Sequence, residues 1–254
     1  MALVRDTAIV LRRLDFSETS QILAMLTREH GQQHLIAKGI KRSTKTRVAV
    51  GIDLLELGSL VYSRRTGREG TLATLTEWRQ EDHFPHLRRS LVGLYAGLYA
   101  AEATTRLTEV HDPHPELFDG LVRLFRALRE EGALATLGSF LWLLLKEVGL
   151  RPDLVRCVSC DRRLGQEPLL YFSSRSGGAI CRDCEPAIVD KRRIDPATAA
   201  VLSEAAAESA GPLPALAAEP AFDLMDYHIR ETLSQPLRVS SSLREVLRQR
   251  RRAP

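Results

Sequence analysis

The chain has 254 residues, of which 44% are apolar and 27% charged, and its formal net charge is +4 at pH 7. This length gives room for one to three domains with a sizeable core, and the charged fraction is ordinary for a soluble protein. No apolar run approaches the ~20 residues that span a bilayer, and residues 1–15 carry no signal-peptide pattern. We therefore expect a cytoplasmic protein that has no membrane partner.

The charge is distributed unevenly along the chain. Three stretches are basic, with 13 bases and 8 acids in residues 1–80, 9 and 6 in 151–193, and 5 and 1 in 241–254. Two stretches are acidic, with 7 bases and 10 acids in residues 81–150, and 2 and 7 in 194–240. Such polarity favours a polyanion as a partner.

Residues 1–80 consist of short strand-like runs separated by turns. Apolar and β-branched runs alternate with turn residues, which predicts five strands and leaves little room for crossover helices. We expect a small antiparallel barrel, and the five-stranded barrel that presents loops to oligonucleotides is the OB fold. An SH3-like barrel or a plain meander fits this pattern nearly as well. The strand-like runs are 8–11, 21–27, 34–37, the pair 54–57 and 60–63, which together continue the pattern, and 71–76.

Two loops of this predicted barrel are rich in bases. Residues 37–47 hold five bases and no acid, and cations at this density cannot be buried without partners. The run is therefore a solvated loop, either a phosphate contact or merely a soluble segment. A second loop, a Gly-containing hairpin, follows residue 63. The candidate phosphate contacts of the two loops are Lys38, Lys41, Arg42, Lys45, Arg47, Arg64, Arg65 and Arg68.

Beyond the barrel the apolar period changes to that of amphipathic helices. Helices are predicted over 87–101, 117–128 and 133–148, and the third ends at Gly149, a typical helix stop. Because its apolar residues lie on nearly all sides, we place the third helix at the centre of a bundle, with Trp142 in the core.

The C-terminal part is also predicted to be helical. Helices are expected over 196–209, 222–233 and 243–252, and the serines at 240–242 are candidate N-caps for the last. The Ala/Pro-rich stretch 205–221 is expected at the surface.

The four cysteines of the chain form two C-x2-C pairs, Cys157 with Cys160 and Cys181 with Cys184, separated by 20 residues. Two such knuckles can present four thiolates tetrahedrally, as in structural zinc sites. A disulfide framework is disfavoured in the cytoplasm, and an iron–sulfur cluster is a lesser alternative. Four protein ligands leave no open position for a water, so we predict one structural Zn²⁺ per chain that stabilises a small ribbon.

Motifs typical of enzymes are missing from the sequence. It contains no G-x-x-x-x-G-K-[ST], G-x-S-x-G or H-E-x-x-H pattern, and its carboxylates form no recognisable acid–base pair. The turn His111-Asp112-Pro113-His114 is the best His/Asp cluster for a second metal, although a helix-capping loop is the better interpretation. We therefore expect a binding protein without catalytic residues.

Several segments together give the chain a recognisable identity. They are the opening strand Ile9-Val10-Leu11, Asp15 to Glu18, the loop Lys38-Gly39-Ile40-Lys41-Arg42-Ser43, Tyr227-His228-Ile229 and Leu237-Arg238. In this order, with the cysteine ribbon inserted before the last helices, they resemble the RecO family of bacterial recombination mediators. The resemblance covers essentially the whole chain.

The resemblance implies a function in DNA repair. It implies a protein that binds single- and double-stranded DNA, anneals complementary strands, and acts with RecR to load RecA onto strands coated by single-strand-binding protein. A location at the nucleoid follows from this role. Some relatives lack the cysteines, which implies that the ribbon supports the structure. The eight bases of the two loops then become candidate DNA contacts, which can follow phosphates without reading sequence.

The aromatic residues of the barrel bear on how DNA would be held. Phe16 and Tyr62 are the candidates for base stacking, and either can belong to the core. Because a stacking platform uses several aromatic side chains, this small number favours backbone binding.

Two other functions fit the sequence less well. One is a protein-binding adaptor that uses the acidic helical bundle and does not bind DNA, and the other is a nuclease with an undetected metal site. The expected fold class is a multidomain α+β protein. Its expected parts are an OB-fold barrel (1–80), the first part of a helical bundle (81–150), a four-cysteine zinc ribbon (151–193), and C-terminal helices completing the bundle (194–254).

Overall fold

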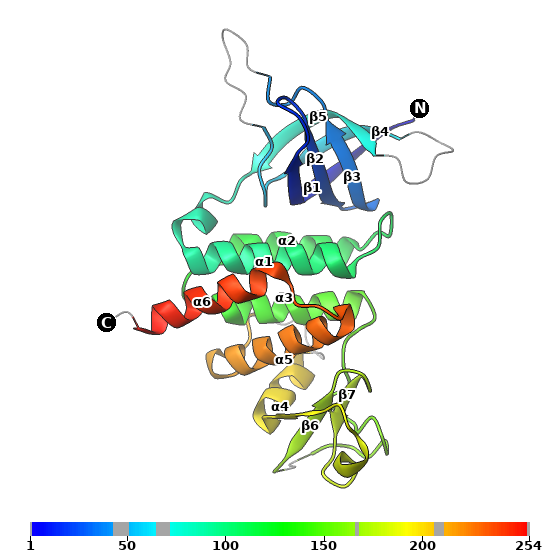
Figure 1. Ribbon diagram of the computed structural model, residues 1–254, viewed down its shortest axis with the longest axis vertical. Coiled ribbons are helices and arrows are strands. Elements are labelled where there is room, and N and C mark those ends of the chain that lie inside the picture. The colour runs from blue at the N-terminus through cyan, green and yellow to red at the C-terminus, as the bar shows by residue number, and fades with distance from the viewer. Residues whose placement is uncertain (1, 43–50, 65–71, 166–167, 206–210, 253–254) are drawn as a thin grey trace. The chain divides into compact units, whose positions relative to one another are not determined.

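The computed structural model of the protein is shown in Figure 1. Its residues group into two compact units, Met1–Arg89 with Ala101–Arg126, and Ser90–Ala100 with Ala127–Pro254. The division runs through one helix, α1 (Leu91–Leu107). The four-part organisation expected from the sequence stays a prediction. The structure describes residues 2–42, 51–64, 72–165, 168–205 and 211–252.

The first unit contains a closed barrel of five strands. Their order around the barrel is β1-β2-β3-β5-β4, and every neighbouring pair is antiparallel except β3 and β5, which run parallel. This order rules out a plain meander and agrees with the predicted OB fold. The strands are β1 (Ala2–Asp15), β2 (Gln21–Thr27), β3 (Gly31–Ala37), β4 (Leu57–Arg64) and β5 (Ala73–Asp82).

One of the strand-like runs, 54–57, does not form a strand of its own. Leu55 has a positive φ of 64°, a conformation that belongs to turns and not to extended chain. Its amide N–H and that of Val10 form a reciprocal bridge to β1, with Leu55 N bonded to Val10 O and Val10 N to Glu56 O, both at 2.9 Å. The fourth strand therefore begins only at Leu57.

Alternate residues of the strands fill the barrel interior. Val10, Leu23, Met25, Leu35 and Tyr62 are all fully buried there, and burying side chains of this size contributes about 1.5–3 kcal/mol each. Tyr62 is thus a core residue, so it is not available to stack on a base.

A helical segment of the same unit packs on the barrel. Its elements are η1 (Pro85–Arg89), the end of α1, and α2 (Pro115–Ala127). The Thr108 hydroxyl donates to Gln32 Oε1 at 3.1 Å, and the Arg28 guanidinium donates to both carboxylate oxygens of Asp119 at 3.1 and 3.0 Å. At Gly31, φ is +66° and an added Cβ would collide with the Asp112 backbone, so this close approach requires glycine.

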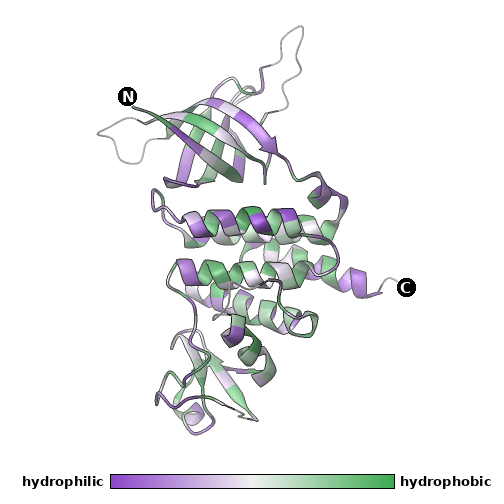
Figure 2. Cartoon of the chain, turned by 180° about the vertical axis from the view of Figure 1, so that it is seen from behind, coloured by the Kyte–Doolittle hydropathy of each residue, from purple (hydrophilic) through white to green (hydrophobic). Residues whose placement is uncertain are grey.

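The second unit is built around α3 (Ala133–Glu147), which packs against α5 (Ala215–Leu233). Figure 2 shows α3 as hydrophobic over most of its length, whereas α2 has alternating hydrophilic and hydrophobic stripes. Trp142 is only 5% exposed, which confirms its predicted place in the core. The helix ends as predicted, because Gly149 has a φ of 71° and the Leu150 N–H bonds back to Leu145 O at 2.7 Å.

The helix α5 corrects one expectation about the C-terminal part. It begins at Ala215, well before residue 222, and includes Pro220 near its start. Ala217, Ala218 and Ala221 are buried, so this end of the Ala/Pro-rich stretch is packed and not at the surface. Alanine favours the helix intrinsically, and its small side chain lets the helix approach its neighbours closely.

The last helix, α6 (Arg238–Arg252), is fixed to α5 by a network around Asp226. This carboxylate accepts hydrogen bonds from the Tyr99 hydroxyl at 2.8 Å, the Ser240 hydroxyl at 2.9 Å and the Arg244 guanidinium at 2.6 Å. Ser240 therefore lies inside the helix and bonds to another element, so the predicted N-cap at 240–242 is wrong.

Most arginines of α6 are paired with carboxylates of the same unit. Arg244 also binds Asp223 at 2.6 Å, and Arg248 lies 2.8 Å from Glu245. Two further pairs join the helix to other segments, Arg250 with Glu130 and Arg251 with Glu219.

The remaining elements of the second unit are short. A three-stranded sheet in the order β7-β6-β8 forms the ribbon, and α4 packs on α5. Their bounds are β6 (Leu170–Ser173), β7 (Gly178–Ile180), η2 (Glu185–Ala187), β8 (Arg192–Ile194) and α4 (Pro196–Ala205).

Candidate metal centre and nucleic-acid interface

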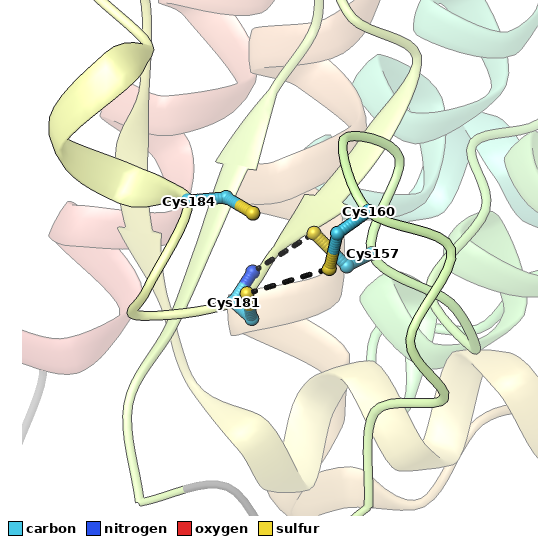
Figure 3. A group of neighbouring side chains, drawn as sticks. All are labelled: Cys157, Cys160, Cys181 and Cys184. Atoms are coloured by element: carbon cyan, nitrogen blue, oxygen red, sulfur yellow. Dashed lines mark hydrogen bonds between the residues drawn. The ribbon is translucent and has the colours of Figure 1, made fainter.

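The four cysteines come together in the ribbon, as predicted (Figure 3). Cys157 and Cys160 lie in a turn before β6, Cys181 directly follows β7, and Cys184 precedes η2. All four sulfurs lie within 4.8 Å of one another, and the Sγ atoms of Cys160 and Cys181 are 3.9 Å apart. Sulfurs bound to one tetrahedral zinc at 2.3 Å are about 3.8 Å apart. The cluster therefore fits a four-coordinate metal and could hold one.

The electrostatics of the cluster favour a bound cation. Burial alone would raise the pKa of the Cys157 thiol, but backbone N–H donors, including that of Cys181 at 3.4 Å, outweigh it and lower this pKa to about 6. The Ser159 hydroxyl would lower the pKa of Cys184, yet the neighbouring sulfurs of Cys181 and Cys160 raise it to about 12. Deprotonating further cysteines in this cluster is thus unfavourable unless a bound metal ion compensates the negative charge of the thiolates.

No disulfide is formed by these cysteines. Among the described residues they are also the only group of three or more potential metal ligands. The turn at 111–114 belongs to the described part and does not assemble such a group; the Phe118 N–H bonds to His114 O at 3.0 Å as α2 begins. This bond agrees with the helix-capping interpretation.

The bases around the knuckles are partly neutralised within the ribbon. Arg162 of the first knuckle lies 2.9 Å from Asp183 of the second, and Arg156 lies 2.9 Å from Asp161. The pair of Arg162 with Asp183 joins the two knuckles, whereas that of Arg156 with Asp161 lies within the first. Both pairs reduce the positive charge that the ribbon presents to solvent.

The ribbon is anchored to the helices through His228 of α5. This side chain is buried, with 5% exposure. Its Nε2 lies 2.8 Å from Leu150 O, and its Nδ1 lies 2.7 Å from the Ser174 hydroxyl. A carbonyl can only accept, so Nε2 carries the proton and Nδ1 accepts from Ser174. The neutral imidazole thus connects the β6–β7 hairpin with Leu150, in the segment that follows α3.

The stability of the protein should depend on this histidine in mildly acidic solution. Burial lowers the pKa of His228, and the bond to Leu150 only partly opposes the effect. Below about pH 6.5, His228 therefore binds a proton in the unfolded chain but stays neutral in the folded chain. The contribution of His228 to the free energy of unfolding is expected to fall as the pH drops from about 6.5 towards the lowered pKa, by up to about 1.4 kcal/mol per pH unit. Above about pH 6.5 this contribution should not change with pH.

Urea unfolding between about pH 5 and pH 7.5 measures this dependence. The pKa of His34 is also lowered, by partial burial and by the charge of Arg12, so the variant His228→Gln is expected to lose only the part of this dependence that His228 contributes. The variant His83→Gln, at an exposed position, should keep the full dependence. Equal pH dependence in wild type and His228→Gln would contradict the role assigned to His228.

The basic loop that follows β3 is partly described. Lys38 and Arg42 are exposed, and neither forms an ion pair or hydrogen bond through its side chain with a described residue. Lys41 instead lies 3.0 Å from the carboxylate of Asp15, and this hydrogen bond lowers the pKa of Asp15. The Lys41 N–H also bonds to Thr19 O at 3.1 Å. Lys41 therefore attaches the loop to the β1–β2 turn.

The other candidate contacts cannot be placed in the same way. Arg64 ends β4, where its backbone pairs with Ala2. Lys45, Arg47, Arg65 and Arg68 lie outside the described residues. The role of these loops in DNA binding stays a prediction.

Sequence reasoning did not find the pairing of Lys41 with Asp15, or the exposure of one aromatic residue. Phe16 is 62% exposed in the β1–β2 turn. The turn pattern after β1 could have indicated that Phe16 lies beyond the end of the strand. The position of the basic loop next to this turn depends on the fold. Within the described part of the chain, none of the helices is both long and apolar enough to traverse a bilayer.

Comparison with known proteins extends these observations. Residues 1–84 match the family model "Recombination protein O N terminal", and residues 88–241 match "Recombination protein O C terminal". The boundary between them lies just after β5.

Similar proteins carry the name DNA repair protein RecO. The protein from Rhodopirellula baltica is 37% identical over 181 residues, which are 70% of this chain and 66% of the relative. That from Bacillus subtilis (strain 168) is 32% identical over 202 residues, 79% and 76% of the two chains. That from Anaeromyxobacter dehalogenans (strain 2CP-C) is 32% identical over 232 residues, 91% and 89%. With both halves matched and a barrel of the expected topology, the chain belongs to the RecO family of DNA repair and recombination proteins.

Proposed function

We infer that the protein is a non-enzymatic DNA-binding mediator of recombinational repair. It binds single- and double-stranded DNA through phosphate contacts of the barrel loops and anneals complementary strands. With RecR it promotes loading of RecA onto strands coated by single-strand-binding protein, in the cytoplasm at the nucleoid. The family membership supports the repair role, and the partners follow from the resemblance of the sequence to mediators of this kind.

The exposed bases of the β3–β4 loop are the observation that supports DNA binding. Lys38 and Arg42 are exposed and unpaired with any described side chain, while Lys41 fastens the loop to Asp15. Two cations are thus held at a fixed place on an OB barrel, a fold that binds oligonucleotides through its loops and strands. Phosphates attracted there release condensed counterions, which supplies affinity without reading sequence.

Annealing needs no catalytic residue under this proposal. Two complementary strands repel each other through their phosphates, and cations that neutralise part of this charge lower the repulsion while base pairing supplies the specificity. The chemistry is thus entirely non-covalent, and no nucleotide cofactor is required.

The proposed cofactor is one structural Zn²⁺ held by Cys157, Cys160, Cys181 and Cys184. The all-sulfur donor set and its compact arrangement suit zinc. Its contribution is to fold the ribbon.

A salt titration tests the proposal. Fluorescence anisotropy of labelled single- and double-stranded oligonucleotides should give a binding constant that falls as salt rises, with a log–log slope of roughly −2 to −5. Annealing of complementary strands should be accelerated at low salt and should disappear together with binding. Labelled strands incubated with Mg²⁺ or Mn²⁺ should stay intact. Absence of binding at physiological salt would favour a protein-binding adaptor, and cleavage would indicate a nuclease.

A further inference from the structure

The four cysteines of the metal centre differ in their exposure to solvent. Cys157 is 1% exposed and Cys181 is completely buried, whereas Cys184 is partly exposed and Cys160 is exposed. Oxidation of cysteines is selective for those that solvent can reach. An oxidant in solution therefore meets the metal centre first at Cys160.

The turn that carries Cys160 is held in place by its backbone. The Asp161 N–H bonds to Cys157 O at 2.8 Å, and the Cys157 N–H bonds to Arg162 O at 2.9 Å. Asp161 has a positive φ of 59°, a left-handed conformation that aspartate adopts more readily than most residues. The exposure of Cys160 is therefore a property of the folded turn.

Basic residues flank the same turn. Residues 156–163 contain the bases Arg156, Arg162 and Arg163 and one acid, Asp161. Two of these bases are paired with carboxylates, whereas Arg163 is exposed and adds positive charge. An exposed cysteine in electropositive surroundings is the type that reacts with oxidants.

A second sulfur lies next to that of Cys160. The Sγ atom of Cys181 is 3.9 Å away, and Figure 3 shows these two sulfurs facing each other. The sulfurs of a disulfide are about 2.0 Å apart, so the pair must approach by roughly 2 Å, which side-chain rotation can supply. Cys181 is too deeply buried to meet an oxidant itself, but it is placed to react with an oxidised Cys160.

We propose that Cys160 is a site of reversible oxidation by hydroperoxides such as hydrogen peroxide, with Cys181 as the resolving cysteine. The inference rests on the proposed zinc site, because a cysteine that binds zinc is a thiolate, which is the nucleophilic form of the side chain. The metal centre then has a second role besides folding the ribbon, since the redox state of its sulfurs controls whether the metal is retained.

The oxidation has two steps. The Cys160 thiolate attacks one oxygen of hydrogen peroxide, so that an S–O bond forms and the O–O bond breaks; the leaving hydroxide takes up a proton, which gives a sulfenic acid and one water. The Cys181 thiolate then attacks the Cys160 sulfur, so that an S–S bond forms and the S–O bond breaks, and the hydroxide leaves as a second water after it is protonated. The two cysteines together lose two electrons, which the peroxide accepts.

Loss of the metal follows from formation of the disulfide. Only Cys157 and Cys184 then remain as thiolates, and two ligands are too few for a closed four-coordinate site. The ribbon thereby loses the stabilisation that a structural metal supplies, including at the hairpin that Ser174 attaches to His228. A dithiol reductant reopens the disulfide by exchange, after which zinc can bind again.

The test treats the reduced, zinc-loaded protein with hydrogen peroxide in the presence of a chromophoric zinc chelator. Wild type should release about one zinc per chain and lose two of its four free thiols, and dithiothreitol with added zinc should restore both. Peptide mapping then identifies the disulfide. Trypsin separates Cys181 from Cys184 by cleaving after Arg182, so the peptide 157–162 should be found linked to the peptide 176–182.

Two histidine variants show which cysteine is attacked. Histidine can replace one thiolate in a zinc site, as in Cys3His centres, but it cannot form a disulfide. Cys160→His should bind zinc and retain it, together with its three thiols, after peroxide treatment. Cys184→His is the matched control, which should bind zinc and release it at the wild-type rate because its Cys160 and Cys181 are unchanged.

The outcomes separate this inference from the zinc assignment. If reduced wild type contains no zinc, both are refuted. If wild type contains zinc but keeps it and all four thiols under peroxide that oxidises glutathione, the oxidation site is refuted while the zinc site stands. A disulfide that includes Cys184, or release of zinc from Cys160→His at the wild-type rate, would contradict the role of Cys160. Should Cys160→His fail to bind zinc, the peptide map of wild type decides between these results.

Discussion

Replacing Cys181 with serine is expected to release the bound metal and unfold the ribbon. The thiol is completely buried next to the three other sulfurs, and a serine hydroxyl is a poor ligand for a thiophilic metal. Structural zinc contributes on the order of 10 kcal/mol to the folding of small domains, far more than the three short strands of the ribbon can replace. Metal analysis should find about one zinc per chain in wild type and essentially none in the variant, whose melting temperature should be lower.

A substitution at the surface of the same ribbon provides the control. Val189 is fully exposed, so Val189→Ser should keep both the zinc and the melting temperature of wild type. A wild-type preparation that is well folded without metal would refute the zinc assignment, as would a Cys181→Ser variant that retains a full equivalent of zinc.

Replacing the five bases of the β3–β4 loop with alanine is expected to abolish most DNA binding. The substitutions are Lys38→Ala, Lys41→Ala, Arg42→Ala, Lys45→Ala and Arg47→Ala. Removing one cation from a bound phosphate lowers the magnitude of the log–log salt slope for single strands by about 0.7. Because Lys41 is paired with Asp15, the other four bases account for the change, which is up to about 2.8. We expect affinity near 0.1 M salt to fall at least roughly a hundredfold, measured by anisotropy across a salt series.

Loss of charge in general must be distinguished from loss of this loop. A control variant replaces four exposed bases of the ribbon with alanine and should bind DNA with a nearly unchanged salt slope. These bases are Arg163, Arg175, Arg182 and Arg193. If the ribbon variant weakens binding as much as the loop variant, DNA binding is not specific to the barrel loop. An unchanged slope in the loop variant would remove this loop from the mechanism.

Local patterns were sufficient to predict most elements and the metal cluster. The apolar run within 21–27 predicts β2 with its observed bounds, and the stop at Gly149 predicts the end of α3. The cysteine knuckles were equally predictable, because ligand spacing within each knuckle is short and only one pairing of knuckles is available. In each case the determining interaction lies within a few residues or is set by the metal.

Features that depend on distant partners could not be predicted. The serines at 240–242 have the local signature of a helix start, yet Ser240 donates to Asp226 and α6 begins earlier. Lys41 is one of five equivalent loop bases in the sequence, and only the fold places Asp15 beside it. The exposure of Phe16 likewise depends on which end of the barrel strands is covered by the helical segment. The periodicity of the sequence does not predict this packing.

The ion pairs of α6 determine how much of the C-terminal charge a polyanion can use. Residues 241–254 carry five bases and residues 194–240 seven acids, but Arg244 and Arg251 already have Asp223 and Glu219 as counterions. A phosphate that approached these arginines would have to displace a carboxylate, and such an exchange releases few small ions and yields little affinity. The charge of the basic C-terminal helix therefore stabilises its own unit through ion pairs. Counting formal charges along the chain overstates the attraction of this helix for nucleic acid.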